Sequence, residues 1–94
     1  MVRERPRPSL DPVIADVAPD GPALTDYDHS MLVCYLRLLD AEKDGAHWRD
    51  VARIVLGLDP NTDYARARRR YDTHLERARW MTTTGYRLLL QEKE

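Results

Sequence analysis

Arginine is the residue type whose number and spacing in this chain most clearly indicate a function. A long helix is predicted over residues 63–82, and its arginines recur on the side away from the apolar stripe. The planar guanidinium group pairs in a bidentate way with guanine edges and phosphates, so such a row is typical of a helix that binds nucleic acid. The candidate DNA-binding residues are Arg66, Arg69, Arg70, Thr73 and Arg77.

Acidic side chains oppose this interpretation. The pI is near 6.3, whereas a dedicated DNA-binding domain usually has a pI above about 9. Residues 10–63 carry a formal charge of −7, and residues 64–94 have an excess of only +4. We therefore predict weak or absent DNA binding, with a solvated, ion-paired helix face as the other explanation of the arginines. The carboxylates that would repel phosphates are Asp59, Asp63, Asp72 and Glu76.

No catalytic or metal-binding motif is evident in the chain. The single cysteine, Cys34, lies in the most apolar predicted helix, where a thiol is normally an inert packing residue. Residues 59–63 imitate the start of an EF-hand calcium loop, but the twelfth position of that loop holds Arg70 instead of a bidentate glutamate. We expect no enzyme activity, no cofactor or metal, and no small-molecule ligand.

The composition indicates one small globular domain. The chain has 94 residues, of which 43% are hydrophobic and 33% are charged. It has no run of about 18 apolar residues that could span a bilayer. Residues 1–12 lack the apolar region of a secretory signal. We expect a cytoplasmic protein that does not contact membranes.

The pattern of apolar residues predicts an all-α fold of three to four helices. Prolines concentrate in residues 1–24, where they exclude a helix, so this stretch is predicted to be a flexible N-terminal arm. The residues that follow, 25–94, are predicted to form the folded domain. The expected helices span 25–42, 46–56 and 63–82, and an apolar piece at 86–90 is expected to fold back on them.

Capping residues predict where the helices begin and end. Thr25 and Asp28 have the spacing of a shortened capping box for the first helix. Gly57 can adopt the left-handed conformation that ends the second helix, and Asp63 can cap the third. Three threonines and a glycine at 82–85 are poor helix formers and are expected to end it.

The second and third helices have the outline of a helix-turn-helix. In that motif the second helix enters the major groove of DNA. The connection over residues 57–62 is longer than the usual turn of three or four residues. We therefore predict a helix-turn-helix variant with an extended turn.

Five short segments carry a resemblance to a known family. They are YLRLLDA at 35–41, WRDVAR at 48–53, GLDP at 57–60, HLERARWM at 74–81 and GYR at 85–87. Together they resemble a proteobacterial domain of unknown function that occurs in regulators carried on integrative and conjugative elements. The resemblance covers residues 26–90 and implies a helix-turn-helix variant with an extended turn.

The resemblance implies two possible functions. The domain occurs as the DNA-binding half of a transcriptional activator, and it also stands alone as an antiactivator that blocks such activators by protein–protein contact. We expect the antiactivator, because the chain is too short to include an activator's N-terminal domain and residues 10–63 are acidic. Its partner would be that N-terminal domain of the activator. The alternative is a transcription regulator that binds DNA through its basic third helix.

A surplus of apolar residues suggests where such a partner would bind. The first helix is apolar nearly all round, which is typical of a helix that is central to its domain or meets a partner. Simple core packing is the alternative explanation. The candidate partner-binding residues are Met31, Tyr35, Leu38, Trp80, Tyr86, Leu89 and Leu90.

Overall fold

The computed structural model describes residues 6–92, and in that part of the chain every regular element is helical. This confirms the predicted all-α class. None of the described helices is long and apolar enough to cross a membrane. The elements are α1 (Asp26–Ser30), α2 (Leu32–Lys43), α3 (Trp48–Ile54), α4 (Tyr64–Trp80), the π-helical turn η1 (Met81–Gly85) and α5 (Tyr86–Gln91).

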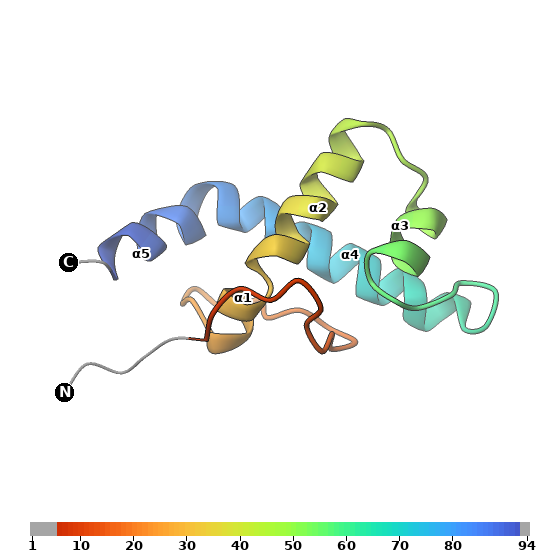
Figure 1. The fold of residues 1–94 in the computed structure, drawn as a ribbon, viewed down its shortest axis with the longest axis horizontal. Coiled ribbons are helices and arrows are strands. Elements are labelled where there is room, and N and C mark those ends of the chain that lie inside the picture. The colour runs from red at the N-terminus through yellow and green to blue at the C-terminus, as the bar shows by residue number, and fades with distance from the viewer. Residues whose placement is uncertain (1–5, 93–94) are drawn as a thin grey trace.

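Helix α4 forms the axis on which the other elements are arranged. Helix α2 crosses α4, α3 packs against α4 near its N-terminal half, and α1 lies at the start of α2 (Figure 1). The rod formed by α4, η1 and α5 gives the molecule a longest extent of 47 Å. Helix α3, the long connection after it and α4 follow one another in the order expected for a helix-turn-helix with an extended turn.

The helix ends confirm the predicted capping residues. Thr25 Oγ1 accepts a hydrogen bond from the Asp28 amide, and Asp28 Oδ2 accepts one from the Thr25 amide, both at 3.0 Å. Asp63 Oδ1 accepts from the Arg66 amide at 3.2 Å at the start of α4. Gly57 has the expected left-handed backbone, with φ +68°. Local chemistry thus determines where these elements begin and end.

One predicted helix is two helices in the structure. The expected helix over residues 25–42 is interrupted at Met31, whose φ of −95° and ψ of 4° leave the helical region. The break separates α1 from α2, and the fully buried Asp28 of α1 bonds to Arg77 of α4. The buried ion pair therefore accompanies a bend that apolar spacing alone cannot predict.

The predicted end of the third helix is wrong. Residues 82–85 continue the helix as part of η1, and α5 extends along the direction of α4 instead of folding back (Figure 1). Gly85 has a helical φ of −62°. A Cβ atom at this position would lie 2.5 Å from Met81 Sδ and 2.8 Å from Trp80 Cζ3. Gly85 therefore makes room for two side chains that pack across the turn.

We expect a Gly85→Ala substitution to destabilise the protein. Alanine favours helices by about 1 kcal/mol over glycine, but crowding a packed site costs about 1–3 kcal/mol. The expected net loss is about 1 kcal/mol in the free energy of unfolding, measured by urea titration. Gly21→Ala is the matched control, because a Cβ there meets nothing within 4 Å. A Gly85→Ala variant as stable as the wild type would contradict the crowding.

A single apolar core lies between the helices. Cys34 belongs to it, and burial raises the pKa of its thiol to about 11. The thiol therefore stays protonated and unreactive at neutral pH, as expected for a packing residue. Other members of the core are Leu24, Met31, Tyr35, Leu38, Val51, Leu56, Leu75, Ala78 and Met81.

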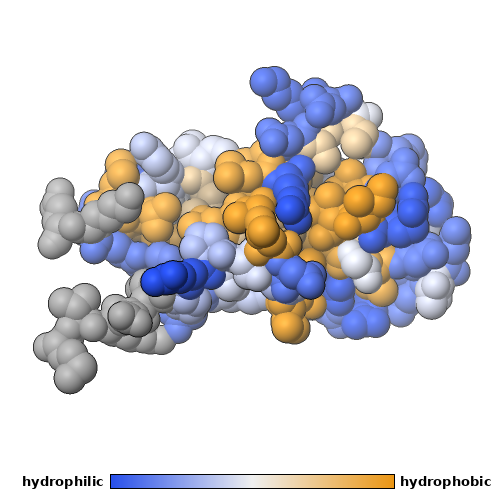
Figure 2. All heavy atoms as spheres, in the orientation of Figure 1, coloured by the Kyte–Doolittle hydropathy of each residue, from blue (hydrophilic) through white to orange (hydrophobic). Residues whose placement is uncertain are grey.

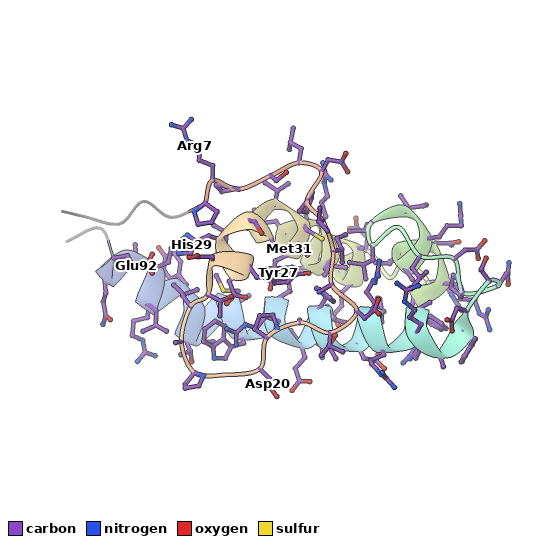
Figure 3. All side chains as sticks on the ribbon, turned by 90° about the horizontal axis from the view of Figure 1, so that it is seen from below. Arg7, Asp20, Tyr27, His29, Met31 and Glu92 are labelled. Carbon is purple, nitrogen blue, oxygen red and sulfur yellow. The ribbon has the colours of Figure 1, made fainter. Side chains whose placement is uncertain are left out.

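The N-terminal segment, residues 6–24, has no regular secondary structure but lies along the helices. The Ser9 amide donates to the Ser30 carbonyl at 3.1 Å, and Arg37 Nη1 donates to the Leu10 carbonyl at 3.2 Å. Ala18 and Leu24 are buried. Figure 3 shows the segment passing across α4 before it turns near Asp20 into α1. The stretch that the sequence predicts to be an arm thus covers part of α4.

Candidate nucleic-acid interface

The five predicted DNA-binding residues do not form one open face on α4. Arg70 and Arg77 are buried, with 8% and 3% of their surface exposed. Thr73 is partly buried beneath the N-terminal segment, and its Oγ1 accepts a hydrogen bond from the Ala18 amide at 3.2 Å. Arg66 and Arg69 are exposed. The structure therefore separates this set into residues that hold the fold and residues that face solvent.

Arg77 is the centre of a buried polar cluster. Its Nε donates to Asp28 Oδ1 at 3.0 Å and its Nη2 to Asp28 Oδ2 at 2.7 Å, so the ion pair is bidentate. Nη1 donates to the Gly21 carbonyl at 2.7 Å, and Nη2 donates to the Ala23 carbonyl at 2.9 Å. The guanidinium carbon lies 3.6 Å from the centre of the Trp80 ring. Every nitrogen of the guanidinium group thus donates a hydrogen bond within the protein.

Asp28 is the acidic partner in this cluster. Burial by itself raises the pKa of its carboxyl group, but hydrogen bonds from Arg77, from the Thr25 backbone and from Tyr35 outweigh burial, and the net pKa is lowered. The Tyr35 hydroxyl donates to Asp28 Oδ1 at 2.8 Å. The carboxylate is therefore ionised at neutral pH, and it ties α1, α2 and α4 together.

Arg70 is likewise a structural residue. Its Nη1 donates to the Leu56 carbonyl at 2.9 Å and thereby anchors the extended turn to α4. Its Nη2 donates to Asp16 of the N-terminal segment at 2.7 Å. The structure leaves neither Arg70 nor Arg77 open to solvent, unlike the exposed row of arginines that the sequence predicts, and their contact with DNA remains a prediction. The physical reason is that helical spacing places them beside Arg66, but backbone carbonyls and carboxylates from distant segments cover them.

Four exposed or partly exposed arginines lie in the first two turns of α4 and at the start of α3. Arg69 is exposed, and within residues 6–92 its side chain makes no hydrogen bond or ion pair. Arg66 is about half exposed and pairs with Asp16 at 2.8 Å. Arg49 of α3 and Arg68 of α4 complete this group. We call Arg49, Arg66, Arg68 and Arg69 the basic cluster.

Aromatic rings position two members of the basic cluster. The Trp48 ring meets the Tyr64 ring edge-on, with ring centres 5.4 Å apart. The guanidinium carbon of Arg68 lies 4.7 Å from the Trp48 ring centre, and that of Arg49 lies 5.1 Å from the Tyr64 ring centre. Cation–π contact restrains both side chains without neutralising their charge. The aromatic group therefore keeps two arginines at the surface where α3 meets α4.

Along α4, carboxylates confine the excess positive charge to the first half of the helix. Asp72 accepts from Arg68 at 3.1 Å, and Glu76 is exposed one turn further along. Arg79 in the last turn pairs with Glu42 of α2. The second half of α4 therefore has a mixed charge, as the sequence indicates.

His74 links the N-terminal segment to α4 through hydrogen bonds. Its Nδ1 lies 2.7 Å from the Arg70 carbonyl, which can only accept, so Nδ1 carries the proton. Nε2 then accepts from the Tyr27 hydroxyl at 2.7 Å. The same hydroxyl accepts from the Ala15 amide at 3.0 Å. Burial lowers the pKa of His74, which agrees with a neutral ring in the folded state.

We expect this buried histidine to make the protein less stable as the pH falls below neutral. The pKa of His74 is lowered from 6.5 on folding, so the unfolded chain takes up a proton that the folded chain resists. The free energy of unfolding should decrease between pH 7 and pH 5, as measured by urea titration. A His74→Gln variant, compared with itself at both pH values, should lose less stability than the wild type. An equal loss in both proteins would contradict the role of His74.

The predicted partner-binding residues also separate into two groups. Met31, Tyr35 and Leu38 lie in the core, so core packing explains these three residues, although Tyr35 also lines the apolar groove described below. Trp80 is partly buried beneath Arg77. The other three predicted residues lie on α5: Tyr86 and Leu90 are exposed, and Leu89 is partly buried.

An apolar groove contains two of the predicted partner-binding residues of α5. It lies between α2 and the η1–α5 rod, with Tyr86 and Leu89 on one side and Leu36, which is 62% exposed, on the other. Figure 2 shows hydrophobic atoms gathered over α2 and toward α5, with hydrophilic atoms around the rim of the molecule. The remaining lining residues are Leu32, Tyr35, Leu39, Met81 and Thr82.

Two members of the basic cluster are not among the predicted site residues. Arg68 lies on the flank of α4 toward Trp48, and Arg49 lies on α3. The sequence signal that could have found them is the recurrence of aromatic residues at 48, 64 and 71 beside arginines. Among the described residues, no three histidine, cysteine or acidic side chains come together as a metal site would require.

A comparison with known families agrees with this arrangement. The RovC_DNA-bd family model, described as "T6SS, Transcription factor, DNA binding domain", matches residues 9–91. The matched range includes most of the N-terminal segment as well as all the helices. No curated protein matches the chain. The match favours the DNA-binding alternative over the expected antiactivator, and the chain belongs to this family of transcription-factor DNA-binding domains.

Proposed function

We propose that this protein is a transcription regulator that binds duplex DNA through the basic cluster. The observation that carries the proposal is the position of the basic cluster. Arg66, Arg68 and Arg69 lie in the first two turns of α4, the second helix of the proposed helix-turn-helix, and Arg49 lies at the start of α3. In helix-turn-helix proteins the N-terminal residues of that helix contact base edges, and the preceding helix crosses the backbone. The family match supports the same function.

The contacts follow from the position of each side chain. Arg69 has an unpaired, exposed guanidinium and can reach a base edge or a phosphate without first breaking an ion pair. Arg49 and Arg68 flank the helix and fit phosphate oxygens of the strands beside the groove. Asp72 and Glu76 would repel phosphates, so only the first two turns of α4 approach the DNA closely.

A titration of fluorescently labelled duplex DNA at several salt concentrations tests the proposal. Each phosphate that is neutralised contributes roughly −0.9 to the slope of log affinity against log salt. Contacts from about three or four arginines should therefore give a slope of about −3. The absence of binding to any duplex at low salt, where electrostatic association is strongest, would contradict the proposal.

Antiactivation by protein contact is the second candidate function, and the apolar groove is the observation that favours it. The partner would be the N-terminal domain of a transcriptional activator, in keeping with the resemblance to regulators of integrative and conjugative elements. The regulated genes would then be those for excision and transfer of such an element. Leu36 at the groove is exposed, and a buried apolar contact there would tolerate salt, unlike a contact with DNA.

Binding to an isolated activator domain distinguishes this second candidate. We expect Leu36→Lys to weaken a complex that forms through the groove. Ile54→Lys is the matched control, because Ile54 is 70% exposed on α3 and lies outside the groove. If Leu36→Lys binds the activator domain as tightly as the wild type and the Ile54→Lys control do, the groove is not the contact surface.

A further inference from the structure

A carboxylate from the N-terminal segment occupies a position between two arginines of α4. Asp16 Oδ1 accepts from Arg66 Nε at 2.8 Å and from Arg70 Nη2 at 2.7 Å. Two guanidinium groups thus converge on one oxygen atom, and both bonds are charge-assisted. Hydrogen bonds from Arg70 and then Arg66 lower the pKa of Asp16, so the group is a carboxylate at neutral pH.

The same pair of arginines has more donors than Asp16 uses. Arg70 Nε is buried and has no hydrogen-bond partner within the described part of the chain. Buried donors are nearly always satisfied, and an unsatisfied one costs about 1–3 kcal/mol. The Arg70 side chain is 91% buried, since only 9% of its surface is exposed. A ligand with more acceptor oxygens than a carboxylate would fit this set of donors better.

We propose that Arg66 and Arg70 form a phosphate site, that Asp16 fills it in the free protein, and that a phosphodiester of bound DNA takes its place. A phosphate offers several acceptor oxygens to the guanidinium groups, where Asp16 uses one. This inference rests on the proposed DNA binding and assigns it a specific contact. It adds Arg70 to the proposed DNA interface beside Arg66, with Asp16 paired to both arginines in the absence of DNA.

The exchange requires little movement of the backbone. The Asp16 side chain is 47% exposed, so it can rotate into solvent while its neighbours stay in place. The backbone on either side is held by other groups: the Ala15 amide bonds to Tyr27, and the Ala18 amide bonds to Thr73. Arg77 separately holds the Gly21 carbonyl. A phosphate can therefore compete for two arginines without unfolding the segment.

Competition from Asp16 lowers the affinity of the protein for DNA. In the free protein one carboxylate neutralises part of the charge of two arginines, and DNA must displace it before it gains those contacts. Removal of the carboxylate should leave both arginines available to a phosphate. We expect the duplex DNA affinity of an Asp16→Asn variant to rise about ten-fold at roughly 0.1 M salt, as expected when one like-charged competitor is lost.

Two comparisons distinguish displacement of Asp16 from a general effect of charge. Asp20→Asn removes the same charge from the same segment, and Figure 3 shows the Asp20 side chain pointing away from α4. We expect it to raise DNA affinity much less than Asp16→Asn does. In an Arg66→Gln background, Asp16→Asn should give a smaller gain, because one of the two competing contacts is gone. Circular dichroism of each variant establishes that the fold is kept.

The experiment has three informative outcomes. A gain confined to Asp16→Asn supports the proposal. Wild-type binding to DNA with no greater gain for Asp16→Asn than for Asp20→Asn overturns the phosphate site but leaves the proposed DNA binding intact. Absence of DNA binding by both wild type and Asp16→Asn overturns both proposals.

An NMR titration of the Arg66 and Arg70 Nε–H resonances identifies the source of the phosphate. One arm uses duplex DNA and the other uses inorganic phosphate at matched ionic strength. Shifts of both resonances with DNA, at phosphate-group concentrations where inorganic phosphate has little effect, support a phosphodiester of DNA as the ligand. Shifts with inorganic phosphate alone overturn that assignment.

Discussion

Replacing Arg77 with methionine should destabilise the protein by about 3–5 kcal/mol. The substitution removes the positive partner of Asp28, whose carboxylate has no exposed surface, and leaves a negative charge buried without compensation. It also removes the donors to the Gly21 and Ala23 carbonyls. Domains have a total stability of about 5–15 kcal/mol, so this loss is a large part of the total. Urea titration monitored by circular dichroism measures it.

Arg79→Met is the matched control, because it makes the same change two residues later on the same helix. Arg79 is exposed and pairs with Glu42 at the surface, where an ion pair contributes about 0–1 kcal/mol. We therefore expect a small effect. Similar stabilities for the Arg77→Met and Arg79→Met variants would contradict a structural role for the buried pair.

Reversing the charge of Arg69 should weaken DNA binding more than any other single change on the surface of α4. Arg69→Glu removes an exposed arginine of α4 that has no ion pair within the described residues, and it adds a charge that repels phosphate. We expect about a ten-fold loss of affinity at roughly 0.1 M salt. Adding Arg49→Glu should bring the loss to about one hundred-fold, since the two arginines lie on different helices and share no contact that would couple their effects. Fluorescence anisotropy with labelled duplex DNA measures both.

Arg87→Glu controls for net charge in this comparison. Arg87 is exposed on α5, at the far end of the rod from the basic cluster (Figure 1). The Arg69→Glu and Arg87→Glu variants have the same net charge, so their difference isolates the position of the arginine. Equal losses of affinity would show that DNA responds to overall charge and would rule out a defined interface on α4.

Local signals in the sequence are sufficient to predict most of the helix boundaries. Thr25 and Asp63 cap α1 and α4 through hydrogen bonds to nearby backbone amides, as predicted. Gly57 has the predicted left-handed conformation, but α3 already ends at Ile54, with Val55 as its C-cap. Gly85 shows where such signals fail. Its low helix propensity predicts a stop, but the packing of Met81 and Trp80 across the turn needs a residue without a Cβ atom, so the helix continues.

The site is harder to predict because it depends on segments that are distant in the sequence. Helical spacing correctly groups Arg66 with Arg70 on one side of α4. It cannot reveal that Asp16 reaches that side, or that the Leu56 carbonyl and the Asp28 carboxylate require buried donors. The same long-range contacts explain part of the excess of acidic residues. Asp16 and Asp28, for example, form ion pairs with the buried arginines of α4.

An NMR titration of the labelled protein with duplex DNA near 0.15 M salt can locate the surface that binds DNA. We expect amide resonances at the start of α3 and in the first half of α4 to shift progressively, and those of residues lining the apolar groove, such as Leu36 and Tyr86, to remain in place. Shifts confined to the groove, or no shifts at a large excess of DNA, would contradict a DNA interface on α4.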